Sequence, residues 1–153
     1  MGEVHEEDGV DVVVVGAGQA GLAASYHLAQ SRIDHIVLER GAIGESWRSQ
    51  RWDSFHLNTP NWSNALPGAA FLAEVPDGFA RSDDLLSFFE GYVRSFGLPV
   101  RANCGVTSLD RRPGGDYELI TDGGRIVGRS VILATGSMSR PRIPMMAPST
   151  RLE

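Results

Sequence analysis

The chain has 153 residues, enough for one domain with a buried core and too few for two. Its formal net charge of −5, with no basic run, argues against nucleic acid as the main partner. The acidic N-terminus has no apolar signal region, and no apolar stretch is long enough to span a membrane. Cys104 is the only cysteine, which excludes a disulfide framework and favours a reducing, cytoplasmic compartment.

The beginning of the chain predicts a strand–helix–strand unit. Val10 to Val15 is a β-branched run that ends at Gly16 and is typical of a central parallel strand buried on both faces. Residues 19–30 are rich in alanine and leucine and predict a helix. Residues 35–39 predict a second strand, so we expect a βαβ unit with a right-handed crossover.

The segment from Arg40 to about Arg81 is long and irregular and holds all three tryptophans. A connection of this length inside a compact domain is either functional or disordered, and its aromatic residues argue against disorder. We therefore expect a loop that wraps over a ligand.

A helix is predicted next, with Ser82 as its N-cap and the carboxylates of Asp83 and Asp84 in the first turn, where they suit the helix dipole. Apolar residues follow at helical spacing, and Gly97 suits the position after the last turn.

The remainder of the pattern is β. Strands are predicted at 106–109, 117–121 and 125–127, joined by glycine-rich turns, and a last apolar strand at 130–134. We expect the first three to form an antiparallel meander. The whole chain is then an α/β fold of the Rossmann type, with a parallel sheet, a βαβ unit and a three-stranded β-meander.

The glycines after the first strand follow the pattern Gly-x-Gly-x-x-Gly, in the strand–turn–helix context of a dinucleotide site. Gly18 lets a pyrophosphate approach the backbone, and the helix N-terminus offers N–H groups to the phosphates. Glu39 closes the second strand, where its carboxylate accepts hydrogen bonds from ribose hydroxyls and repels a 2′-phosphate. The alternative is a glycine turn that binds nothing. The predicted contacts here are Gly16, Gly18, Gln19, Ala20, Gly21 and Glu39.

These residues alone leave FAD and NAD open, and three further segments decide between them. They are Ile43-Gly44-Glu45-Ser46-Trp47-Arg48, the run from Arg51 to Pro60, and Val131 to Gly136, which ends in Ala-Thr-Gly. Together with the glycine turn they resemble the flavin-containing monooxygenases and their bacterial relatives. The resemblance implies a two-dinucleotide-fold flavoprotein that holds FAD here and uses NADPH and O2 to oxygenate small molecules.

The resemblance also implies roles for single residues. Gly44 and Trp47 are expected along the FAD, with Trp47 as a core aromatic being the alternative. Arg48 is expected to neutralise pyrophosphate charge or to be solvated, and Glu45 replaces the second glycine of the family segment. The remaining implied cofactor contacts are Arg40, Thr59, Val106, Ala134, Thr135 and Gly136.

Asn58 is the predicted catalytic residue, because it matches a family asparagine beside the flavin and the nicotinamide. A neutral amide there donates and accepts hydrogen bonds without adding charge, and a dry polar site protects a reactive flavin–oxygen adduct. The alternative is a loop-turning asparagine. Asn61 takes no role, since many relatives place a lysine there. The histidines lack ligand spacing, so no metal is expected.

The second glycine motif for NADPH is absent from the sequence, so the fold is expected to be incomplete relative to the family. We predict a flexible N-terminus at 1–8, the N-terminal part of an FAD-binding domain at 9–140 and a truncated linker at 141–153. Turnover then requires a C-terminal NADPH-binding half, with no nucleic-acid or membrane partner. The alternative is a non-catalytic FAD- or ADP-binding fragment or a truncated remnant.

Overall fold

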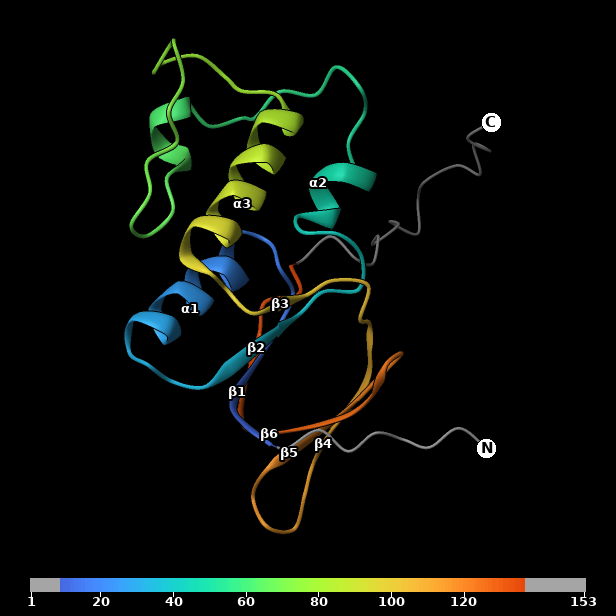
Figure 1. The fold of residues 1–153 in the computed structure, drawn as a ribbon. Helices are drawn as coiled ribbons and strands as arrows, with labels where there is room; N and C mark the ends of the chain where they lie inside the picture. Colours follow the sequence, from blue (N-terminus) through green and yellow to red (C-terminus); the bar gives the residue numbers. More distant parts are fainter. Residues whose placement is uncertain (1–8, 137–153) are drawn as a thin grey trace, which may run out of the picture.

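The structure is a computed structural model that describes residues 9–136 (Figure 1). One six-stranded sheet has the order β3-β2-β1-β6-β5-β4. Strands β3, β2, β1 and β6 are parallel, whereas β6, β5 and β4 pair antiparallel as a meander. This confirms the predicted α/β fold of the Rossmann type. The strands are β1 (Val10–Val15), β2 (His35–Leu38), β3 (Val100–Arg101), β4 (Val106–Arg111), β5 (Tyr117–Thr121) and β6 (Gly124–Leu133).

In the view of Figure 1, α2 and α3 lie above the parallel strands, α1 lies to their left, and the meander lies below them. Leu22 of α1 and Phe89 of α3 pack with Val14 and Val37 of the sheet in one fully buried core. Leu119 and Ile126 of the meander build a second core with Val13 and Leu38. The helices are α1 (Gln19–Gln30), α2 (Glu45–Ser49), the 3-10 helix η1 (Asn61–Asn64) and α3 (Ser82–Phe96).

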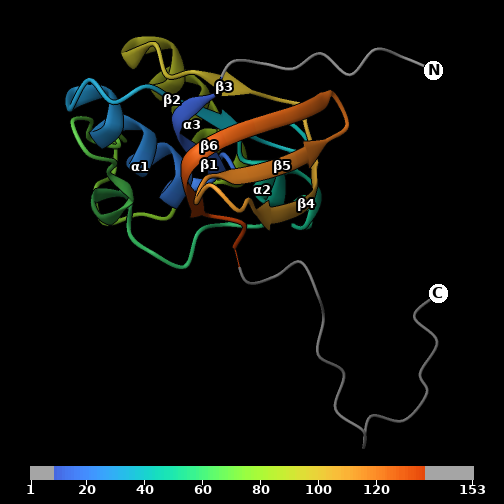
Figure 2. The same cartoon turned by 90° about the horizontal axis from the view of Figure 1, so that it is seen from below.

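Strand β6 differs from the sequence prediction, because the two strands expected at 125–127 and 130–134 are one continuous strand. Its first half pairs antiparallel with β5 and its second half parallel with β1 (Figure 2). Gly128 stands at the change of partner, paired with both Tyr117 and Val10. A Cβ atom on Gly128 would lie 2.7 Å from Cγ2 of Val13, so a glycine is needed at this crossing.

The start of α3 also differs from the prediction. The N-cap residue is Arg81 and not Ser82, which is the first residue of the helix. The backbone N–H of Arg81 donates to Oδ2 of Asp84 at 3.0 Å, so a carboxylate in the first turn accepts the N–H of the N-cap residue, as in a capping box. The helix ends as predicted at Gly97, whose φ of 60° is left-handed.

The segment 40–81 is more ordered than an irregular loop, because it contains α2 and η1. Phe55, Leu57 and Leu66 are buried in the main core. The N–H of Leu57 donates to the carbonyl of Ala80 at 2.8 Å, which joins the middle of the segment to its C-terminal end. Residues 40–81 therefore form a lobe that is packed on the main core. The predicted N-terminal segment 1–8, the tail 141–153 and the domain end at 140 lie outside the described residues.

None of the helices in residues 9–136 has the length and the apolar run that a membrane span requires.

Tyr92 of α3 anchors the 40–81 lobe to this helix, since its hydroxyl donates to the carbonyl of Pro67 at 2.7 Å. Burial, with a smaller contribution from Tyr26, raises the pKa of Tyr92 from 10.0 to about 12. Because the pKa is higher in the folded state, its contribution to stability is complete below pH 10 and is lost as the pH rises towards 12. The chain contains no lysine, so few other groups titrate in this range.

We expect Tyr92→Phe to lower the free energy of unfolding at pH 7 by about 1 kcal/mol, because the Pro67 carbonyl loses its donor. Between pH 10 and 12 the wild type should lose stability and the variant should lose less. Urea unfolding at pH 7 and pH 11 measures both, with the half-buried Tyr117→Phe as the control. Parallel losses in wild type and Tyr92→Phe would show that Tyr92 is not the group responsible.

Candidate cofactor site

The glycine turn between β1 and α1 is shaped by close backbone contacts. The N–H of Gly16 donates to the carbonyl of Leu38 at 2.8 Å. A Cβ atom on Gly21 would lie 1.8 Å from the Gly16 carbonyl oxygen, so this position tolerates only glycine. A Cβ atom on Gly18 would instead meet nothing within 4 Å. The turn thus leaves an open space directly over the backbone of Gly18.

The first turn of α1 faces this space with exposed Gln19 and Ala20. Gly18 is the N-cap and supplies no side-chain acceptor, and the first turn holds no acidic residue. The N–H groups of a first helical turn have no partners within the helix, and the dipole favours negative charge there. The open space over Gly18 is therefore suited to a pyrophosphate.

Glu39 lies at the other end of the turn and is only 8% exposed. Its Oε2 accepts the N–H of Ala17 at 2.8 Å, and its Oε1 accepts the N–H of Gly41 at 3.1 Å. A carboxylate has about four acceptor positions, so each oxygen retains capacity for a hydroxyl donor. Glu39 both fixes the glycine turn and presents acceptors next to it.

Residues of two other strand ends reach this region. The carbonyl of Glu39 accepts the N–H of Cys104 at 2.8 Å, which brings Val106, at the start of β4, and exposed Arg40 to the same edge. Ala134 follows β6, and its N–H donates to the carbonyl of Val15 at 2.8 Å. A Cβ atom on Gly21 would lie 3.5 Å from that of Ala134, so a small residue fits there. Thr135 and Gly136 follow as exposed residues at the same end of the sheet.

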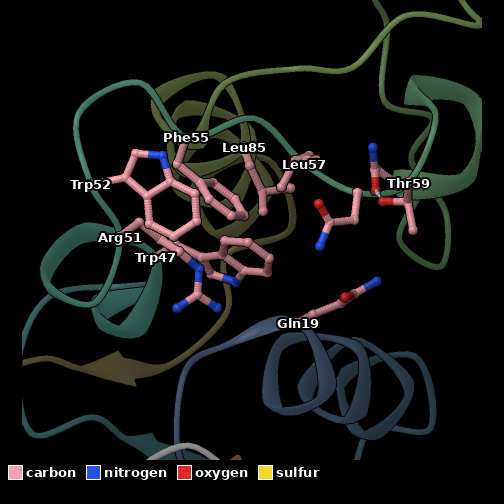
Figure 3. A pocket seen from close by; sticks show the side chains of 10 residues that line it. Gln19, Trp47, Arg51, Trp52, Phe55, Leu57, Thr59 and Leu85 are labelled. Carbon is pink, nitrogen blue, oxygen red and sulfur yellow. Dashed lines mark hydrogen bonds between the residues drawn. The ribbon is translucent and has the colours of Figure 1, made fainter.

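A cavity of about 460 Å³ opens on the Gln19 side of the turn, beneath the 40–81 lobe (Figure 3). Four predicted site residues line it, namely Gln19, Trp47, Asn58 and Thr59. Most of the lining residues belong to the segment 40–81, for which the sequence predicts a loop that wraps over a ligand. Six further lining residues were not assigned a role from the sequence: Arg51, Trp52, Phe55, Leu57, Asn64 and Leu85.

The walls of the cavity are aromatic on one side and polar on the other. The ring centroids of Trp52 and Phe55 are 4.9 Å apart in an edge-to-face contact, and those of Trp47 and Phe55 are 6.1 Å apart. Oγ1 of Thr59 donates to Oδ1 of Asn64 at 2.6 Å. Figure 3 shows Gln19, on α1, across the cavity from the aromatic group. Trp47 is half-buried, so it both packs on Phe55 and lines the cavity.

The segment around α2 holds the other predicted contacts. The N–H of Gly44 donates to the carbonyl of Ala17 at 3.0 Å, and its φ is 70°. A Cβ atom on Gly44 would lie 2.7 Å from Cδ2 of Leu86, so this glycine allows the segment to pack on α3. Glu45 folds back, and its Oε2 accepts the N–H of Ala42 at 3.0 Å.

Arg48 pairs with a residue of α3 instead of lining the cavity. Its Nη2 lies 3.0 Å from Oε1 of Glu90 on α3, in an exposed ion pair. Arg48 is not among the residues that line the cavity.

Glu39 contacts the glycine turn at Ala17, and Gln19, in the first turn of α1, lines the aromatic cavity. An acid after the second strand, an open glycine turn and a helix N-terminus together define a dinucleotide-binding domain. The chain belongs to the pyridine nucleotide-disulphide oxidoreductase family, whose model matches residues 13–151.

Individual relatives agree with this family. The chain is 40% identical over 141 residues to an uncharacterized CzcO-like oxidoreductase of Geobacillus kaustophilus, covering 92% of this chain and 40% of that protein. It is 32% identical over 136 residues to the indole-3-pyruvate monooxygenase YUCCA1 of Oryza sativa, covering 86% and 33%. The structure of a flavin-containing monooxygenase from Stenotrophomonas maltophilia superposes with a TM-score of 0.82 at 30% identity, covering 90% and 42%.

These similarities confirm the predicted resemblance to flavin-containing monooxygenases. The chain spans about 40% of the length of the first of these relatives. A bacillithiol disulfide reductase from Bacillus cereus also superposes, with a TM-score of 0.83 over 95% of this chain and 45% of that one. At 22% identity that likeness concerns the fold alone.

Proposed function

We propose that this chain is the FAD-binding part of an NAD(P)H-dependent flavoprotein monooxygenase that acts on a small organic molecule. The observation that carries the proposal is the open space over Gly18, between the carboxylate of Glu39 and the aromatic cavity. An extended molecule with a ribose, a pyrophosphate and a flat ring fits that order of sites. The relatives named as monooxygenases support the same assignment.

Each region of the site has a part in holding such a cofactor. Glu39 accepts the ribose hydroxyls, and the N-terminus of α1 binds the pyrophosphate. The cavity between Gln19 and Trp47 takes the flavin ring and excludes water with its aromatic wall. Bound FAD supplies hydride acceptance and oxygen activation, while the protein supplies orientation and a dry site.

We assign Asn58 a place beside the flavin ring, because it is an exposed residue that lines the cavity. We expect Asn58→Ala to retain FAD, since the pyrophosphate and ribose contacts remain, but to change the position or shape of the visible flavin band. Absorption spectra of both FAD-loaded proteins measure this. Superimposable spectra would contradict a place for Asn58 beside the flavin and would favour the alternative, a loop-turning asparagine.

The visible spectrum of the purified chain after FAD addition and gel filtration tests the proposal. A flavin band that remains with the protein is the expected result. Loss of the band from a chain that circular dichroism shows to be folded would contradict it. Assays of NADPH oxidation and oxygen uptake then separate an enzyme, which we propose to need an NADPH-binding half, from a module that binds FAD without turnover. A cytoplasmic location remains a prediction from the single cysteine.

A further inference from the structure

Arg51 presents a positive charge to the cavity and has no carboxylate partner within residues 9–136. Its side chain lines the cavity and is half-buried. Among residues 9–136, no ion pair joins Arg51 to an acidic side chain, and its hydrogen bond runs from Nη1 to the carbonyl of Gln50 at 2.9 Å. Arg48 contrasts with it, since that guanidinium is neutralised by Glu90. A cation at a cavity wall without an anion suits a ligand that carries or acquires negative charge.

The guanidinium of Arg51 is held in place by aromatic rings. Its central carbon lies 4.8 Å from the ring centroid of Trp47 and 5.2 Å from that of Phe55. Figure 3 shows the group beside Trp47, on the side of the aromatic cluster that faces α1 and Gln19. Stacking of this kind fixes the plane of the guanidinium, and the N–H groups other than the one bonded to Gln50 can donate at its edge.

We propose that Arg51 stabilises the reduced, anionic form of the flavin over its oxidised, neutral form. The inference rests on the proposed function, because it assumes that the cavity holds the flavin ring. A hydride donor delivers two electrons and one proton to the ring. The proton stays bound, and one negative charge remains delocalised over the ring. A fixed cation at the cavity wall is attracted to that charge and gains nothing from the neutral ring, so it raises the reduction potential.

Two variants of Arg51 separate charge from packing. Arg51→Gln removes the charge and Arg51→Lys keeps it on a side chain that stacks less well. Arg112→Gln, on the exposed β4–β5 turn, removes the same charge far from the cavity. The FAD-loaded proteins are reduced with dithionite in the presence of a reference dye, and the midpoint potential is read from the two absorption spectra. The dissociation constant of oxidised FAD is measured separately by fluorescence.

We expect Arg51→Gln to shift the reduction equilibrium about tenfold towards the oxidised form, which lowers a two-electron midpoint potential by about 30 mV. The affinity for oxidised FAD should change much less. Arg51→Lys should keep most of the wild-type potential, and Arg112→Gln all of it.

Two results would overturn the inference while leaving FAD binding intact: an unchanged potential in Arg51→Gln, or equal losses in Arg51→Gln and Arg51→Lys. Failure of the wild type to retain FAD would overturn the proposed function, and this inference with it.

Discussion

Gly18→Ala should fold normally and fail to retain FAD. The backbone at Gly18 has φ −87° and ψ −171°, which any residue adopts, and the added methyl group would meet no atom of residues 9–136 within 4 Å. Alanine is a poorer N-cap than glycine, so a loss of up to about 1 kcal/mol of stability is expected. The methyl group would fill the space that the pyrophosphate needs, and we expect FAD to bind at least about tenfold more weakly.

Gly21→Ala should instead lose stability, because its methyl group would lie 1.8 Å from the Gly16 carbonyl oxygen. Backbone must move to relieve this overlap, at a cost of about 3 kcal/mol or more. Gly114→Ala is the control, since its methyl group also meets nothing within 4 Å but lies on the distant β4–β5 turn. Thermal unfolding and FAD titration of all three variants measure both effects. Undiminished FAD binding by Gly18→Ala would mean that the pyrophosphate does not bind at the glycine turn.

Glu39→Ala should lose both stability and FAD. The substitution removes the acceptors of the Ala17 and Gly41 N–H groups, and Ala17 is fully buried. An unpaired buried donor costs about 1–3 kcal/mol, so we expect a total loss of about 3 kcal/mol. The ribose hydroxyls lose their acceptors at the same time. Glu39→Gln keeps one carbonyl oxygen and should fall between the two proteins in both properties.

Urea unfolding and FAD titration measure these losses, with exposed Glu74→Ala as a matched control expected to stay within about 0.5 kcal/mol of the wild type. Full stability in Glu39→Ala would mean that backbone and solvent can replace the carboxylate in the glycine turn. Full FAD affinity would mean that the ribose does not bind at Glu39.

Those elements that depend on local signals could be predicted from the sequence. The β-branched run at 10–15 and the alanine-rich segment at 19–30 reach the predicted bounds, because each pattern matches one regular structure. The sequence predicts two strands at 125–127 and 130–134, whereas β6 continues through Gly128, although a glycine weakens the interior of a strand. Only the pairing of this glycine with both β1 and β5 shows that the strand continues through it.

The candidate site shows the same division. The glycine turn and Glu39 follow from spacing along the chain, whereas Arg51, Asn64 and Leu85 reach the cavity through tertiary packing. Arg51 is placed by stacking on Trp47 and Phe55, and Leu85 belongs to a helix that the pattern assigns to the core. A single sequence carries no signal for such long-range contacts. Arg48 is a residue that packing keeps out of the site, since the orientation of α2 on α3 pairs it with Glu90.

The pairing of β1 with β6 sets the order in which this molecule assembles. Asp11 and Arg129, whose side chains are 2.8 Å apart, are separated by 118 positions along the chain. The central strand that precedes the glycine turn therefore acquires its second neighbour only after β6 (Gly124–Leu133) has been synthesised. Bringing together residues so far apart in the sequence costs conformational entropy. Contacts of this kind slow the folding of a domain. Until β6 arrives, one edge of β1 remains open to pairing with other chains, and the nascent protein is most prone to aggregation during that interval.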